Sequence, residues 1–181
     1  KEYLVLSLSF EAADEYFQSL ESLAEGLVMD IGECLRAQQV SEEIIAMWNS
    51  PLSEKFPMRS LGAKITALCS ACQKKVILMI DEVDKSSDNQ IFLSFLGLLR
   101  EKYLKWQQGK DQTFQSVILA GVYDIKTLKL KLHPQEESKY NSPWNIAVDF
   151  LVDMSFSAEQ IAAMLDEYEE DYHTGMNIND V

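Results

Sequence analysis

The chain has 181 residues, of which 47% are apolar and 25% are charged, an ordinary composition for a globular protein. Its 29 acidic residues outnumber 16 basic ones, and the net charge of −13 makes binding to a nucleic-acid backbone unexpected. No apolar run approaches the ~20 residues that span a bilayer, so we expect no membrane segment. Three cysteines are too few, and odd in number, for a secreted disulfide framework. Together with the lack of a basic-then-apolar leader, this favours a cytoplasmic protein.

Strands and helices are expected to alternate along the chain. In chain order we expect a strand (3–10), a long helical region (12–39), two helices (41–48 and 60–73), a strand (76–80), a helix (89–107), two strands (114–122 and 146–154) and a helix (158–172). Gly26 and Gly32 predict a break inside the long helical region. Ser157 predicts a capping-box start, although the acid, Glu159, falls one residue early. Near-continuous apolar strands separated by helices predict an α/β fold with a covered, mostly parallel sheet.

The most informative stretch places two acids directly after five apolar residues. Residues 76–80 (VILMI) predict a buried central strand, and Asp81 and Glu82 follow at its carboxyl end. Ligands of open α/β sheets bind at that end. A carboxylate there can hold Mg²⁺ through its water shell, as in Walker-B-type sites, and an adjacent carboxylate can polarise a water. Asp81 is therefore the candidate for the metal side and Glu82 the candidate general base. The alternative is an ordinary strand that ends in solvated acids.

A second buried strand at residues 116–121 ends in Val122, Tyr123 and Asp124. In Walker-type ATPases the strand beside the acidic one carries a polar sensor at its tip. Tyr123 or Asp124 could take that role, and an ordinary turn is the alternative.

Three segments resemble one family, namely residues 76–85 (VILMIDEVDK), 116–126 (SVILAGVYDIK) and 140–150 (YNSPWNIAVDF). They are similar to the predicted bacterial AAA-like ATPases, P-loop NTPases related to the AAA+ and STAND groups. The resemblance covers nearly the whole chain. It implies a three-layer sheet of P-loop NTPase type, a helical lid, hydrolysis of ATP with Mg²⁺, and further domains in the same polypeptide.

One required motif is missing. Such an ATPase cradles phosphates with G-x-x-x-x-G-K-[ST] after its first strand. The glycines here stand at positions 26, 32, 62, 97, 109, 121 and 175, and none fits that pattern. We expect the P-loop and the first strand to lie before Lys1. We also expect residues 1–154 to be a partial ATPase core and residues 155–181 the start of a truncated lid.

The sequence therefore favours a fragment of an ATPase, inactive alone, in which Glu82 activates water, Asp81 holds Mg²⁺, and Tyr123 or Asp124 senses the γ-phosphate. The rival is a degenerate, non-enzymatic module of the same fold that binds a protein partner. ATP and Mg²⁺ would act in the intact protein, and we expect neither on this chain alone.

Strand order follows from the same resemblance. The strands at residues 3–10, 76–81 and 116–121 should be contiguous and parallel, with 76–81 in the middle. The first strand of such ATPases would lie between 116–121 and 146–154. An empty place there would leave buried backbone groups unpaired, at ~1–3 kcal/mol each. Either the strand at 146–154 pairs directly with 116–121, or a second molecule covers the edge, so we expect self-association or a protein partner.

The 181-residue chain should bind Mg-ATP weakly or not at all. Without a nest of backbone N–H donors, the carboxylates of Asp81 and Glu82 only repel the triphosphate. Isothermal titration calorimetry with Mg-ATP checks this expectation. Micromolar affinity in this chain would contradict it.

Overall fold

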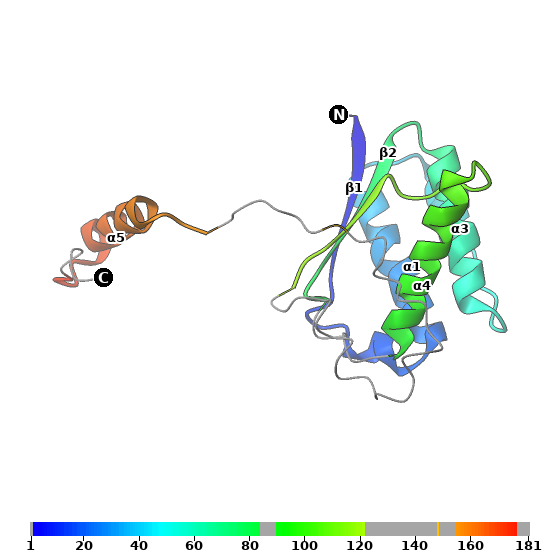
Figure 1. Cartoon of the computed structure of the whole chain (residues 1–181), viewed down its shortest axis with the longest axis horizontal. Helices are drawn as coiled ribbons and strands as arrows, with labels where there is room; N and C mark the ends of the chain where they lie inside the picture. The colour runs from blue at the N-terminus through cyan, green and yellow to red at the C-terminus, as the bar shows by residue number, and fades with distance from the viewer. Residues whose placement is uncertain (1, 84–89, 122–147, 149–154, 177–181) are drawn as a thin grey trace. The chain divides into compact units, whose positions relative to one another are not determined.

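The computed structural model describes residues 2–83, 90–121, 148 and 155–176 (Figure 1). The chain divides into two compact units, Lys1–Ala147 and Val148–Val181. Among the described residues, no helix combines the length and the apolar character that crossing a membrane requires.

A three-stranded parallel sheet organises the first unit. It consists of β1 (Tyr3–Ser9), β2 (Lys75–Asp81) and β3 (Ser116–Leu119), in the order β1-β2-β3. Leu6 pairs with Leu78, which in turn pairs with Val117 on the other side. The expected order of the three strands, with the acidic strand in the middle, is thereby confirmed.

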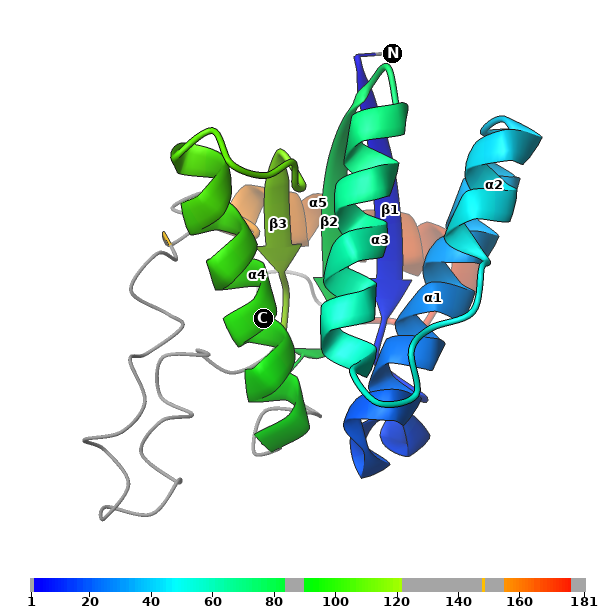
Figure 2. The same ribbon diagram turned by 90° about the vertical axis from the view of Figure 1, so that its right-hand side faces the viewer.

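The two faces of the sheet differ because alternate side chains of a strand point to opposite sides. One face carries the buried residues of β1 and β2, which are Leu4, Leu6, Leu8, Val76, Leu78 and Ile80. Helices α1, α3 and α4 lie against that face (Figure 2). Tyr3, Met79 and Ile118 are exposed. Of the three expected layers, the described residues of this unit supply two.

Among the described residues of this unit, five helical segments accompany the sheet: η1 (Asp14–Gln18), α1 (Leu20–Ala37), α2 (Glu42–Trp48), α3 (Pro57–Ala71) and α4 (Gln90–Gln107). The long helical region does break, but at Ser19 and not at the glycines. Ser19 is extended (φ −155°, ψ 161°), and its side chain accepts a hydrogen bond from the N–H of Ser22 at 2.9 Å as the N-cap of α1. Helix α3 begins three residues earlier than expected, because Pro57 is suited to the first turn of a helix.

The glycines inside α1 allow close approach and do not interrupt the helix. A Cβ atom at Gly26 would lie 2.5 Å from the ring of Tyr16, and one at Gly32 would lie 2.7 Å from Oδ1 of Asn49. Both glycines are buried in continuous helix. The cost of glycine in a helix is therefore offset here by the packing of η1 and of the α2 terminus against α1.

Helix α1 also seals the outer edge of β1. Gln38 Nε2 donates to the carbonyl of Val5, and Cys34 Sγ donates to the carbonyl of Ser7 at 3.3 Å. An edge whose carbonyls are bonded to side chains is a poor template for another strand. Any extension of the sheet would therefore take place beyond β3. The predicted strand at 146–154 lies outside the described residues except for Val148, so its pairing stays a prediction.

A polar network ties the segment before β3 to two helices. Lys102 Nζ donates to Asp111 Oδ2 at 2.8 Å and to Thr66 Oγ1 at 2.6 Å, and Thr66 Oγ1 donates to Asp111 Oδ1 at 2.7 Å. Burial acts to raise the pKa of Asp111, but the hydrogen bonds from Lys102 and Thr66 and the charge of Lys102 outweigh it and lower that pKa. The carboxylate thus stabilises the fold above its unfolded pKa, and this contribution is lost as the pH falls through the lowered value.

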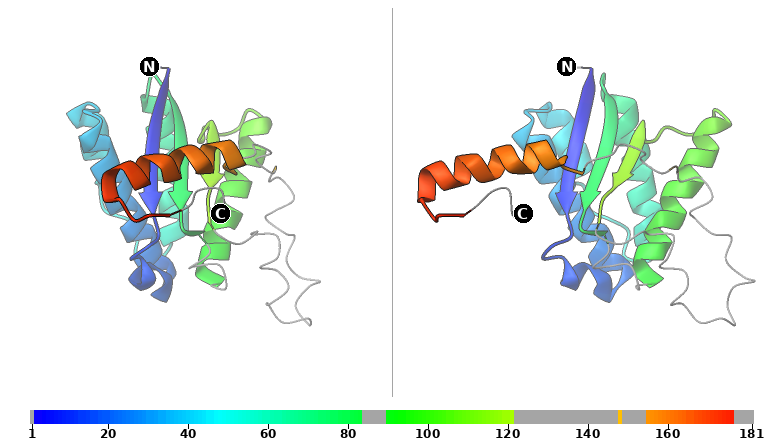
Figure 3. Two further views of the ribbon diagram at one scale, coloured as in Figure 1. Left: turned by 90° about the vertical axis from the view of Figure 1, so that its left-hand side faces the viewer. Right: turned by 60° about the vertical axis from the view of Figure 1, so that its left-hand side comes forward.

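The second unit contains α5 (Ala158–Tyr172), with the bounds expected from the sequence (Figure 3). Ser157 caps it in a capping box whose partner is Gln160 and not the acid Glu159. The Gln160 N–H donates to Ser157 Oγ, and the Ser157 N–H donates to Gln160 Oε1. Glutamine fills the third helical position of a capping box as well as glutamate does.

Substituting alanine for Gly26 should lower the free energy of unfolding by about 1–2 kcal/mol, because the new methyl group collides with a ring that is itself held by a hydrogen bond from Tyr16 to Asp30. The matched control is Gly97→Ala in α4, where a Cβ meets nothing within 4 Å. That control should gain up to about 1 kcal/mol from helix propensity. Urea denaturation of both variants measures the difference, and equal shifts would refute the packing explanation.

Candidate active site at the end of β2

Asp81 is the last residue of the central strand, and its side chain is exposed. Its carbonyl accepts the N–H of Phe10 at 3.0 Å, which extends the pairing with β1 past the strand ends. Its Oδ1 accepts the N–H of Glu82 at 2.8 Å. The backbone around this carboxylate is thus held on the β1 side, at the edge of the sheet where the parallel strands end.

Glu82 leaves the strand in the left-handed region, with φ +57°. Such a backbone costs a non-glycine residue roughly 1–2 kcal/mol. The next residue explains why the conformation persists: Val83 is fully buried, and its N–H donates to the carbonyl of Ala120 at 3.1 Å. Ala120 in turn donates its N–H to Ile80 at 2.9 Å. The turn that carries Glu82 is therefore fixed between β2 and the end of β3.

This arrangement suits a magnesium ion that keeps most of its water shell. Mg²⁺ is usually held by one or two carboxylates together with waters and substrate phosphates. Among the residues that the structure describes, no group of three or more His, Cys, Asp or Glu side chains could enclose a metal. A single exposed carboxylate at a strand end fits the first kind of site and not a dedicated protein cage.

The other site residues expected from the sequence are not brought together by the described structure. Tyr123 and Asp124 lie outside the described residues, so their sensor role stays a prediction. The stretch from Gly62 to Lys64 belongs to α3, and the buried Lys64 donates to the carbonyl of Trp48 at 2.6 Å and to Ser50 Oγ at 2.8 Å. That lysine is a structural tie between helices, which agrees with the absence of a P-loop at this position.

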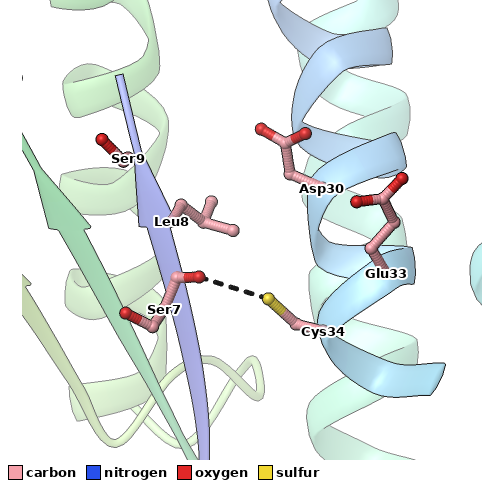
Figure 4. Close-up of a pocket in the computed structure, with 6 residues that line it drawn as sticks. All are labelled: Ser7, Leu8, Ser9, Asp30, Glu33 and Cys34. Carbon is pink, nitrogen blue, oxygen red and sulfur yellow. Dashed lines mark hydrogen bonds between the residues drawn. The ribbon is translucent and has the colours of Figure 1, made fainter. Parts of the chain in front are cut away.

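The structure adds an acidic hollow that the sequence did not indicate (Figure 4). About 230 Å³ in volume, it lies between β1 and α1 and is lined by Ser7, Leu8, Ser9, Asp30, Glu33 and Cys34. Asp30 and Glu33 are three residues apart and therefore share a helix face. This spacing was the one feature of the sequence that pointed toward a cluster of acids here. The hollow is close to the candidate site along the sheet, because Ser9 is the β1 partner of Asp81.

Burial shapes the chemistry of that hollow. The hydroxyl of Tyr16 donates to Asp30 Oδ1 at 2.9 Å. Burial raises the pKa of Tyr16 to about 12, assisted by its bond to Asp30, and burial likewise raises the pKa of the Asp30 carboxyl. None of the residues lining the hollow is basic. The hollow therefore offers hydrogen-bond acceptors but no positive charge that could offset the negative charge of a phosphate.

The positive φ of Glu82 yields a stability test. Glu82→Gly should raise the free energy of unfolding by about 0.5–1 kcal/mol, because glycine adopts the left-handed conformation without a Cβ penalty. Gln39→Gly is the matched control, since Gln39 has φ +54° and is exposed at the end of α1. Thermal or urea unfolding should show gains of similar size in both variants. Destabilisation by Glu82→Gly alone would contradict the view that this turn is strained.

Comparison with known proteins identifies the first unit. The sequence model of one family, described as "Predicted AAA-ATPase", matches residues 1–131. No curated protein and no solved structure matches the chain. The match includes the three parallel strands, the acidic pair after β2 and the site-bearing turn. With nearly three quarters of its length matched, the chain belongs to the predicted AAA-ATPase family.

Proposed function

We propose that Asp81 and Glu82 form part of an ATP-hydrolysing site. They supply the carboxylates that hold Mg²⁺ and activate the attacking water. The observation that carries this proposal is the position of Asp81 and Glu82 at the carboxyl end of the middle strand of a parallel sheet, in a chain of the predicted AAA-ATPase family. This is the end of an α/β sheet at which ligands bind.

Asp81 and Glu82 take different roles in this site. The Asp81 carboxylate would hold Mg²⁺ through its water shell, and the backbone hydrogen bonds around Asp81 keep the residue in position. Mg²⁺, when bound with the nucleotide, offsets negative charge on the phosphates. Glu82 accepts a proton from the attacking water as general base. The strained turn between Ile80 and Val83 keeps Glu82 out of the regular strand, so that adjacent acids take separate roles.

Catalysis by this unit requires a phosphate cradle that the 181 residues do not contain. We propose that a G-x-x-x-x-G-K-[ST] segment of the same polypeptide supplies it, and that the isolated chain is inactive. Tyr123 or Asp124 would complete the site as the γ-phosphate sensor.

A second candidate is a non-enzymatic module of ATPase fold that binds a protein partner. The observation that favours it is the net charge of −13, which suits a protein partner with a basic surface. In a polypeptide that has no P-loop, the first unit would have kept the ATPase fold without the ability to hydrolyse ATP. The two candidates differ in whether Glu82 affects turnover in the full polypeptide.

The decisive variants are made in a polypeptide in which these residues follow a strand bearing G-x-x-x-x-G-K-[ST]. Glu82→Gln should lower the rate of phosphate release by about 10²-fold or more and leave nucleotide binding nearly intact, because the amide keeps the shape and loses the base. Asp81→Asn should weaken the Mg²⁺-dependent part of nucleotide binding by about 10- to 100-fold, as loss of an outer-shell ligand does.

Glu43→Gln in α2 serves as the matched control, since it removes one exposed glutamate away from the site. It should behave like the parent in both assays. If Glu82→Gln hydrolyses ATP at the parent rate, Glu82 is not the base. If the parent polypeptide binds no nucleotide, the chain is a non-enzymatic module of ATPase fold.

A further inference from the structure

Three aromatic rings meet just beyond the end of β1. They belong to Phe10, which follows β1, to Phe17 in η1 and to Phe92 in the first turn of α4, and together they are called the aromatic triad. The ring centroid of Phe10 lies 5.2 Å from that of Phe17 and 6.0 Å from that of Phe92, at interplanar angles of 82° and 87°. The rings of Phe17 and Phe92 are 6.3 Å apart at 90°. Each pair therefore has the edge-to-face geometry that aromatic rings favour.

The aromatic triad lies at the end of the sheet that carries the candidate site. η1 and the start of α4 lie at the end toward which the arrows of β1 and β2 point (Figure 2). Phe10 and Phe92 are buried, with exposed fractions of 0% and 1%, and Phe17 is half-buried. η1 is itself held on α1, because the hydroxyl of Tyr16 donates to Asp30. In an interior packed this closely, one ring of the triad cannot shift far without displacing the others.

Backbone hydrogen bonds connect the aromatic triad to Asp81. The N–H of Phe10 donates to the Asp81 carbonyl at 3.0 Å, and the Phe10 carbonyl accepts the N–H of Ala13 at 3.3 Å. Phe10 thus carries both a ring of the triad and a bond to the candidate for the metal side. A displacement of that ring moves the backbone to which it is attached, and with it the bond to Asp81. Reactive groups are sensitive to such movements, since a misplacement of about 1 Å can cost about 10²-fold in rate.

We propose that the aromatic triad positions the Asp81 carboxylate toward the waters of the Mg²⁺ shell. Phe10, Phe17 and Phe92 are then positioning residues, which act through the backbone of Asp81 and do not touch the metal or the nucleotide. This inference rests on the proposed function of Asp81. It goes beyond that function because it assigns the geometry of the metal side to apolar residues from three separate segments.

The two sides of the site should respond differently to loss of a triad ring. The triad is bonded to the site at Asp81, on the β1 side. Glu82, the proposed base, is fixed on the other side, because the N–H of the buried Val83 donates to the carbonyl of Ala120. Loss of a triad ring should therefore weaken the use of Mg²⁺ more than it slows turnover at saturating Mg²⁺.

The first test measures the position of Phe10 in the 181-residue chain, without nucleotide. Phe92→Leu removes one ring of the triad and keeps an apolar side chain. NMR hydrogen exchange should show that the Phe10 N–H exchanges faster relative to the Val83 N–H by about tenfold, because the ratio cancels any loss of global stability. Phe95→Leu is the matched control, since Phe95 is also 1% exposed and its ring contacts Phe92 from outside the triad, at 6.4 Å. It should leave that ratio at the parent value.

The second test measures the Mg²⁺ dependence of ATP hydrolysis in the polypeptide that joins these residues to a P-loop. Phe92→Leu should raise the Mg²⁺ concentration for half-maximal rate by roughly three- to tenfold, less than direct loss of an outer-shell ligand does. Its rate at saturating Mg²⁺ should stay within about twofold of the parent. Phe95→Leu should match the parent in both quantities.

A second pair of variants keeps the test independent of how well Phe92→Leu folds. Phe17 is only half-buried, so a hydroxyl added there costs less than one added at a fully buried position. Phe17→Tyr retains the ring and should behave like the parent in both tests. Phe17→Leu removes the ring and should shift the exchange ratio and the Mg²⁺ dependence in the same direction as Phe92→Leu.

Failure of this inference differs from failure of the proposed function. If the parent polypeptide hydrolyses ATP but the two ring-deleting variants keep its Mg²⁺ dependence or its exchange ratio, the triad does not position Asp81. An equal shift in Phe95→Leu would also overturn the inference, because core packing in general would then be the cause. A parent polypeptide that hydrolyses no ATP overturns the proposed function itself, and the role of the triad falls with it.

Discussion

Parallel pairing of β2 with a strand on each side determines where the candidate site of this chain lies. The pairing places the carboxyl ends of three strands at one edge, and the acids at the end of β2, Asp81 and Glu82, are held there by backbone hydrogen bonds to the segments on both sides. Phe10 binds the carbonyl of Asp81, and Val83 binds the carbonyl of Ala120. The buried side chain of Val83 resists any relaxation of the turn between them. The strain at Glu82 is thus maintained by packing that lies outside the acidic pair.

The helices support this edge from one side of the sheet. α1 packs on β1 and also binds its outer carbonyls through Cys34 and Gln38, so β1 is a closed edge. The network of Lys102, Asp111 and Thr66 fixes the chain just before β3. The position of Asp81 therefore depends on both neighbouring strands, because the ends of the three strands are joined by backbone hydrogen bonds. A substitution far from Asp81 that shifts β1 or β3 can move the candidate site.

The sequence predicted what depends on local pattern and missed what depends on tertiary contact. The apolar run before Asp81 predicted a central strand correctly, and Ser157 predicted the start of α5. The expected break at Gly26 and Gly32 was wrong because the neighbours that need the space, Tyr16 and Asn49, come from other segments. The positive φ of Glu82 could not be predicted, since it depends on Val83 and Ala120 and carries no glycine signal. The acidic hollow beside Ser9 was missed for the same reason, because β1 and α1 meet there only in the folded chain.

The central claim is that the acids after β2, and not the acids of the hollow, face the metal of a nucleotide site. Paramagnetic broadening by Mn²⁺ with bound ADP distinguishes them, in an NMR spectrum of a polypeptide that joins this unit to a P-loop. We expect the amide signals of Asp81, Glu82 and Phe10 to broaden first. Broadening confined to Asp30, Glu33 and Cys34 would contradict it and would place the metal at the edge of β1.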